Sequence, residues 1–123
     1  MSVKLTTHQK GEVTIIDISG KLTLGEGTSS LRTKIRELVA GGSRHFILNM
    51  ADVSYMDSSG LGEMIASHTT VTTAGGEMKL LNLAKHVHDL LKITKLYTVF
   101  EAFEDEASAV NSFSAAKTAE GQA

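Results

Sequence analysis

The alternation of short strand-like runs with helix-like runs is the feature that most constrains the fold of this 123-residue chain. Two β-rich runs, Lys4 to Gln9 and Val13 to Ser19, flank Lys10-Gly11-Glu12 and predict a hairpin. Further on, "HFILNM" from His45 to Met50 is a compact apolar run of the kind that forms a buried strand. Such an alternation predicts an α/β domain in which crossover helices pack on a mixed sheet.

Two longer helices are predicted from apolar residues at helical spacing. Thr28 or Ser29 could cap the first helix, which Gly41-Gly42 ends. The second helix begins near Leu61 and stops at Gly75-Gly76. The positions that carry these patterns are Leu31, Ile35, Leu38 and Val39 in the first helix, and Leu61, Met64, Ile65, His68 and Val71 in the second.

The remaining third of the chain predicts shorter elements: a strand at Met78 to Leu81, a short helix around Val87 to Leu91, an extended piece at Tyr97 to Phe100 and a closing helix from Glu104 to Phe113. We therefore expect one α/β domain over residues 1–113, with a mixed sheet of four to five strands and about four helices packed mainly on one face. Residues 114–123 are polar and are expected to form a flexible tail.

Composition excludes several classes of function. A net charge of -2 and a pI near 6.2 give no electrostatic footprint for nucleic acid or an anionic membrane. The chain has no cysteine, which excludes disulfides and thiolate metal sites, and His86 and His88 lie at the wrong spacing for a helical metal pair. No apolar run approaches the length of a membrane span. We expect a soluble cytoplasmic protein without a metal or cofactor.

One stretch, "SYMDSSGLGEM" from Ser54 to Met64, is unusual for the opening of a helix. Asp57, Ser58 and Ser59 are all good N-cap residues, but a structural cap needs only one of them. The two glycines that follow each weaken a first turn by about 1 kcal/mol relative to alanine. Capping alone therefore leaves the glycines unexplained.

Three functional interpretations compete with capping. Ser58 or Ser59 could be a nucleophile, although the G-x-S-x-G pattern is missing and spacing ties no histidine to the serines. The histidines available as a base are His8, His45, His68, His86 and His88. A phosphate-binding loop would need the Walker lysine or the G-x-G-x-x-G spacing, and both are absent. The third interpretation is a switch: an exposed serine that a kinase can reach, on a surface where small residues let a partner approach.

The same stretch carries a resemblance to a known family. "MDSSGLG", preceded by "HFILNMADVSY", resembles the signature of the STAS domain, and specifically the single-domain bacterial anti-sigma factor antagonists. "ISGKLT" from Ile18 to Thr23 is similar to the end of the family's second strand, and "AGGEMKLLNL" is similar to its fourth. The segment "HDLLKITKLYTVFEAFEDEASAV" resembles the family's closing part, so the likeness covers most of the chain.

The resemblance implies a partner switch rather than an enzyme. The unphosphorylated antagonist binds an anti-sigma factor that is also a serine kinase, and this binding frees the sigma factor. The kinase then phosphorylates the serine after the aspartate, here Ser58 with Ser59 as the alternative, and the complex separates. A serine phosphatase resets the cycle, and the antagonist is a monomer or weak homodimer. The alternative from the same family is a STAS scaffold or regulatory module in a larger signalling assembly with a non-sigma output.

The resemblance also assigns a docking surface. Thr23 occupies a position near the phosphorylation loop where many family members carry an acidic residue. Residues of the loop and of the first helical turns complete the expected surface: Thr23, Asp57, Ser58, Ser59, Gly60, Leu61, Gly62 and Met64.

Overall fold

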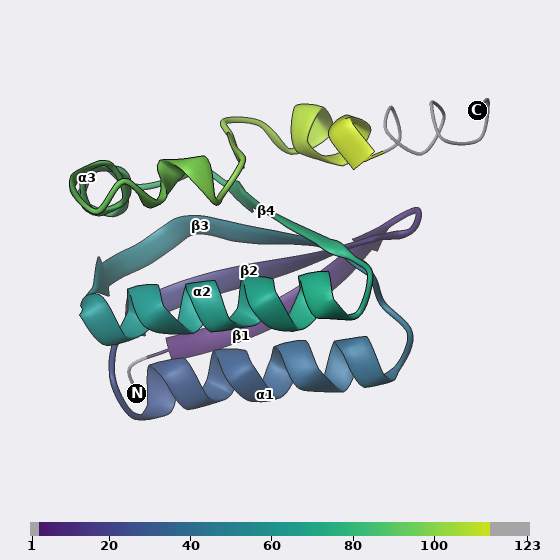
Figure 1. Ribbon diagram of the computed structural model, residues 1–123, viewed down its shortest axis with the longest axis horizontal. Coiled ribbons are helices and arrows are strands. Elements are labelled where there is room, and N and C mark those ends of the chain that lie inside the picture. Colours follow the sequence, from purple (N-terminus) through teal and green to yellow (C-terminus); the bar gives the residue numbers. More distant parts are fainter. Residues whose placement is uncertain (1–2, 114–123) are drawn as a thin grey trace.

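The computed structural model describes residues 3–113 and contains a five-stranded mixed sheet (Figure 1). The strands lie in the order in which they occur along the chain, with β1 antiparallel to β2 and the other neighbouring pairs parallel. Their bounds are Val3–Lys10 (β1), Val13–Leu22 (β2), His45–Met56 (β3), Glu77–Leu81 (β4) and Ala102–Phe103 (β5). Gly11 turns the β1–β2 hairpin with a φ of 63°, which confirms the predicted hairpin.

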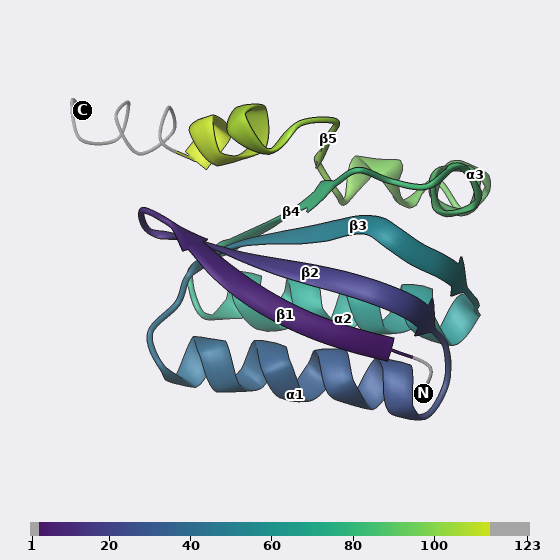
Figure 2. The same cartoon turned by 180° about the vertical axis from the view of Figure 1, so that it is seen from behind.

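Helices cover both faces of this sheet (Figures 1 and 2). The helices α1 (Glu26–Ala40) and α2 (Ser58–Thr73) lie side by side on one face, and α3 (Lys85–Ile93) follows β4. A last helix over 106–113 lies across the sheet from α1 and α2. The expected α/β class, strand number and helix number are therefore confirmed.

Strand alternation divides the apolar residues between two cores. The larger core lies under α1, α2 and α3 and includes Ile16, Leu48, Met64 and Val87, all with no exposed surface. The smaller core lies on the other face, under helix 106–113. Its members are Val13, Ile15, Ile47, Leu81, Ala109 and Phe113. The closing helix is thus part of the packed structure of the described residues.

Several predicted boundaries are wrong. Strand β3 continues to Met56, six residues beyond the predicted end at Met50. The helix α1 begins at Glu26 after Gly25, whose φ is 106°, so neither Thr28 nor Ser29 is its cap. The extended piece predicted at Tyr97 to Phe100 is instead a 3₁₀ turn at Leu96–Thr98, and β5 follows it at Ala102–Phe103. Left-handed Lys95, with a φ of 63°, redirects the chain after α3, which overrides the strand preference of tyrosine and valine.

A buried lysine ties helix 106–113 to the sheet. The Nζ atom of Lys79 on β4 donates to Ser112 Oγ at 2.8 Å and lies 4.4 Å from the centroid of the Phe113 ring. The same atom lies 3.1 Å from Glu101 Oε1. Within residues 3–113, no helix is both long and apolar enough to cross a membrane. The predicted tail, residues 114–123, lies outside the described residues.

Candidate functional site

The stretch around Ser58 lies where two strand-to-helix connections meet. Strands β2 and β3 are parallel, and Leu22 pairs with Met56 at their carboxyl ends. Helix α1 follows β2 after a short loop and α2 follows β3 directly, so both helices begin at the same edge of the sheet (Figure 1, left). In α/β folds, ligands and partners commonly bind at the carboxyl ends of parallel strands, where the loops to the helices begin.

Asp57 organises this edge. Its backbone is extended, its Oδ1 accepts a hydrogen bond of 2.9 Å from the amide of Gly60, and α2 begins at the next residue. Its Oδ2 accepts a longer bond of 3.4 Å from the amide of Leu24 in the loop before α1. Of the three cap candidates in the sequence, Asp57 is therefore the N-cap, and it also connects the two loops.

The two glycines of α2 have different surroundings. A Cβ atom on Gly60 would collide with the carbonyl oxygen of Leu22 and lie 2.9 Å from Cγ of Met56. The helix therefore packs on the end of β2 through a position that only glycine fits. An added Cβ on Gly62 would have no atom within 4 Å beyond its chain neighbours and the backbone of its own helix, so no packing contact within residues 3–113 requires glycine there. Gly60 is a packing residue and Gly62 is a surface residue.

Ser58 and Ser59 also differ in exposure. Ser58 is exposed on the first turn of α2, whereas Ser59 is half-buried. Ser59 lies four residues before Glu63 and so shares its helix face. Glu63 is only 4% exposed and faces α1, where its Oε1 accepts bonds of 2.7 Å and 3.1 Å from the Arg32 guanidinium. The geometry therefore leaves Ser58 as the more accessible of the two hydroxyls.

Two apolar residues beside Ser58 were missed by the sequence reasoning. Leu24, in the loop held by Asp57, is 77% exposed, and Tyr55 near the end of β3 is 53% exposed. Leucine and tyrosine in a strand-rich sequence suggest a core, so only the fold shows that these two face outward. Leu24 and Tyr55 therefore add exposed apolar surface near the two connections that meet at Asp57, and tyrosine is among the residues enriched at protein interfaces.

Three residues expected on the docking surface are buried, and that expectation is corrected. Gly60 packs on β2, Leu61 is 6% exposed and Met64 is fully buried in the larger core. They occupy the face of α2 that is turned to the sheet, so partner contact with them would require the helix to move. Thr23 is half-buried, and its carbonyl oxygen accepts a 3.2 Å bond from the amide of Thr28. The next residue, Leu24, donates to Asp57, so Thr23 lies in the loop that is connected to the start of α2, and its role in docking stays a prediction.

The site contains no catalytic pair among the described residues. None of the hydrogen bonds within residues 3–113 joins the hydroxyl of Ser58 or Ser59 to a histidine, and His68 instead packs edge-on against Phe100 with a centroid separation of 5.3 Å. The same part of the chain contains no group of three or more histidine, aspartate or glutamate side chains placed to hold a metal ion. The site therefore consists of the exposed hydroxyl of Ser58 on the first turn of α2, which Asp57 and Gly60 hold in place.

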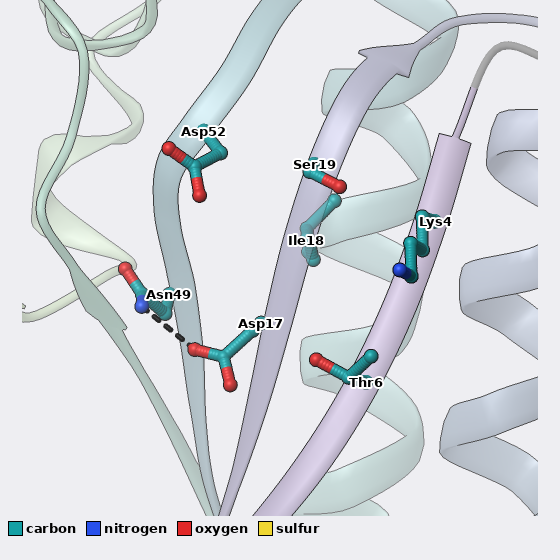
Figure 3. Close-up of a pocket in the computed structure, with 7 residues that line it drawn as sticks. All are labelled: Lys4, Thr6, Asp17, Ile18, Ser19, Asn49 and Asp52. Atoms are coloured by element: carbon teal, nitrogen blue, oxygen red, sulfur yellow. Dashed lines mark hydrogen bonds between the residues drawn. The ribbon is translucent and has the colours of Figure 1, made fainter.

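A second polar region lies on the face of the sheet opposite α1 and α2 (Figure 3). It is a hollow of about 160 Å³ whose lining includes Lys4 and Thr6 on β1 and Asp17 on β2. The Nδ2 of Asn49 donates to Asp17 Oδ1 at 2.7 Å, and Asp17 Oδ2 lies 2.9 Å from Nδ1 of His8. Asp17, Asn49 and His8 are already paired with one another, so they offer a ligand fewer unpaired polar groups. The start of α2, where the hydroxyl of Ser58 is unpaired within residues 3–113, is therefore the better candidate site.

The chain is similar to known proteins over most of its length. The STAS domain family matches residues 4–109. The anti-sigma F factor antagonist of Paenibacillus polymyxa is 28% identical over 104 residues, which are 84% of this chain and 87% of that protein. The anti-sigma-B factor antagonist of Bacillus subtilis is 31% identical over 101 residues, 82% of this chain and 91% of that one.

A solved structure has the same fold. The Bacillus cell fate determinant SpoIIAA in its phosphorylated form superposes with a TM-score of 0.70 at 21% identity. The match covers 89% of this chain and 99% of that protein. At this identity the likeness concerns the fold, and the function has to be argued from the site.

Proposed function

The chain belongs to the STAS domain family, and on that premise we propose that it is an anti-sigma factor antagonist controlled by phosphorylation of Ser58. In its unphosphorylated form it binds an anti-sigma factor that is also a serine kinase, and the bound sigma factor is released. Phosphorylation of Ser58 ends that complex, and a serine phosphatase restores the binding form. The names of two relatives, antagonists of anti-sigma F and anti-sigma-B factors, support the first step.

The observation that carries the proposal is the exposure of Ser58 on a rigid support. Asp57 fixes the helix start and Gly60 packs it against Leu22, while the hydroxyl of Ser58 has no partner among residues 3–113. A kinase can therefore reach the hydroxyl without unfolding its surroundings. The phosphorylated form known for the structurally similar SpoIIAA supports a phosphate as the switch.

The docking surface that we propose surrounds this serine. Leu24 and Tyr55 provide exposed apolar contact area, and tyrosine is among the residues that contribute most to the binding energy of protein interfaces. Gly62, one turn along the same helix, leaves the surface flat enough for close approach. The surface comprises Thr23, Leu24, Tyr55, Asp57, Ser58, Ser59 and Gly62, of which Thr23, Asp57 and Ser59 are half-buried.

Electrostatics explain how a phosphate can release the partner and spare the fold. A phosphoserine carries a charge of about -1.5 to -2 near neutral pH. At the N-terminus of α2 the helix dipole favours negative charge, so the monomer tolerates the group. A partner packed over Ser58 would have to desolvate that charge beside the Asp57 carboxylate. A hundredfold loss of affinity requires about 2.7 kcal/mol, an ordinary cost for one unpaired charge in an interface.

The proposed protein is a regulator whose chemistry is performed by its partners. The kinase supplies ATP and the phosphoryl transfer, and the phosphatase removes the group. A serine nucleophile at Ser58 or Ser59 is the competing idea, and a serine-reactive phosphonate tests it directly. We expect no covalent label on either residue, because the described residues place no base within hydrogen-bond distance of the hydroxyls. Labelling of Ser58 would favour the enzyme.

The test is a set of affinity measurements with the serine-kinase anti-sigma factors of the source organism. Ser58→Ala should bind its kinase as tightly as the native chain, since it removes only a hydroxyl from an exposed position. Ser58→Asp should bind at least tenfold more weakly, about 1.4 kcal/mol, because it places one charge in the interface. Thr69→Asp is the matched control, because it adds the same charge at an exposed position of α2 outside the docking surface, and it should bind as the native chain does. Equal affinity of native chain and Ser58→Asp would contradict the proposal.

A further inference from the structure

An apolar groove lies at the far edge of the sheet, between α3, the 3₁₀ turn and β5. Figure 2 shows these three elements gathered beyond β4. The groove has a volume of about 590 Å³, within the range of small-molecule sites in proteins. Its lining consists of Leu83, His88, Leu91, Lys92, Lys95, Tyr97, Phe100 and Ala102.

The base of the groove is apolar and well supported. Leu91 and Phe100 are 3% and 5% exposed, so both belong to the packed core as well as to the groove. Ala102 on β5 contributes only a methyl group, which leaves space beside the 3₁₀ turn. Tyr97 is 59% exposed and adds an aromatic wall. An apolar chain that entered the groove would lose contact with water on several sides.

The lining side chains that can carry a charge near neutral pH are all basic. His88, Lys92 and Lys95 are spaced at i, i+4 and i+7, so the first two share one face of α3 and the third follows its end. No carboxylate is among the lining residues. Within residues 3–113, the amino groups of Lys92 and Lys95 make no ion pair or hydrogen bond, whereas Lys85 on the same helix pairs with Asp89 at 2.9 Å. Two exposed lysines whose amino groups make no ion pair or hydrogen bond among residues 3–113 therefore line an apolar space.

We propose that this groove binds a free fatty acid, with the acyl chain against Leu91 and Phe100 and the carboxylate between Lys92 and Lys95. An apolar space with a cationic rim complements a single apolar chain that ends in one anion. The volume suits a small molecule, whereas a peptide helix could place only a few side chains in it. This function is separate from the switch at Ser58, because none of the residues of the proposed docking surface lines the groove.

The first test is an NMR titration of the whole chain with dodecanoate at concentrations where it is monomeric. We expect saturable shifts at the amides of the groove residues, and an affinity that falls about fourfold for each methylene removed from the chain. Dodecyltrimethylammonium has the same chain and the opposite charge, and it should bind at least tenfold more weakly. Absence of saturable shifts with dodecanoate, or equal binding of the two amphiphiles, would overturn the proposal.

Substitutions locate the binding. The double variant Lys92→Gln/Lys95→Gln removes two exposed charges and should weaken dodecanoate binding about tenfold. Lys4→Gln/Lys21→Gln removes the same charge from exposed positions on β1 and β2, and it should bind as the native chain does. Ala102→Phe keeps both cations and fills the groove, so it should abolish binding.

Two further outcomes would refute a fatty-acid site. Equal affinity of both double variants would show that the rim lysines do not hold the carboxylate. An acidic amphipathic peptide that saturates the groove residues while dodecanoate does not would reassign the groove to a protein partner.

Discussion

The starts of α1 and α2 lie next to each other and are built on the same backbone segment, but their surroundings differ. Gly27 in α1 packs against the backbone of Lys21 and Leu22 at the end of β2, and Gly60 in α2 packs against the backbone of Leu22. The residue before α1, Gly25, has no side chain to act as a cap, whereas Asp57 before α2 caps its helix and also holds the loop before α1. One aspartate therefore orders both helix starts.

The residues around the two helix starts fall into two groups, those that support the helices and those that are exposed to a partner. The support consists of glycines that are enclosed by backbone atoms, and the exposed part consists of Ser58 and Gly62 on the outer side of α2. A switch residue has to be reachable without loosening the fold that presents it. Substitutions of the supporting residues should lower stability, whereas substitutions of the exposed residues should affect binding.

Gly60→Ala should have the largest effect on stability. Its Cβ would collide with the Leu22 carbonyl oxygen, and because that oxygen belongs to the backbone, α2 must shift away from β2. We expect the free energy of unfolding to fall by about 3 kcal/mol or more. Urea denaturation followed by circular dichroism measures it. A loss below about 1 kcal/mol would show that the approach is not as close as the structure has it.

Gly27→Ala tests the equivalent contact of α1. The added Cβ would lie 2.7 Å from the Lys21 carbonyl oxygen, a less severe overlap than the one at Gly60. We expect a loss of about 1–3 kcal/mol in the same denaturation experiment. If Gly27→Ala proved more destabilising than Gly60→Ala, the order of the two contacts would be wrong.

Asp57→Ala should remove the feature that distinguishes the two helix starts. It deletes the acceptor for the Gly60 amide and the longer bond to the Leu24 amide, and we expect a loss of about 1–2 kcal/mol. Hydrogen exchange of both amides should rise together, since one side chain protects both. Asp57→Asn is the control, because asparagine is an equally good cap and should keep most of the stability. Faster exchange at Gly60 alone would argue against a link between the loops.

Gly62→Ala should have the smallest effect and the opposite sign. The added methyl meets no atom within 4 Å, and alanine is favoured over glycine within a helix by about 1 kcal/mol. We expect unchanged or slightly increased stability in the denaturation experiment, together with weaker binding of the anti-sigma factor. Unchanged binding by Gly62→Ala would remove this residue from the docking surface.

The sequence predicted the order of the elements because their patterns are local. The apolar run at His45 to Met50 lies in β3, and Gly41-Gly42 ends α1, with Gly42 at a φ of 105°. The error at Tyr97 to Phe100 arose where a left-handed residue, Lys95, reversed the chain. Lysine gives no sign of that conformation in a sequence, so strand preference alone was misleading there.

The candidate site was predicted in its location and only partly in its composition. Three adjacent residues could each have been the cap, and the bonds to Gly60 and Leu24 identify Asp57. The need for glycine at position 60 comes from Leu22, which is 38 residues earlier in the chain and adjacent only in the fold. Exposure of Leu24 and Tyr55, and burial of Leu61 and Met64, likewise depend on which face of each element meets the sheet.

We propose that Ser58 is the residue through which a partner kinase controls this protein. The most direct measurement is the intact mass with site mapping after incubation with ATP and each serine-kinase anti-sigma factor of the source organism, for the native chain and for Ser58→Ala and Ser59→Ala. We predict that one kinase adds a single phosphate to Ser58, that Ser59→Ala is modified equally and that Ser58→Ala is not modified. A phosphate on Ser59 that persists in Ser58→Ala, or no phosphate from any of these kinases, would contradict the account.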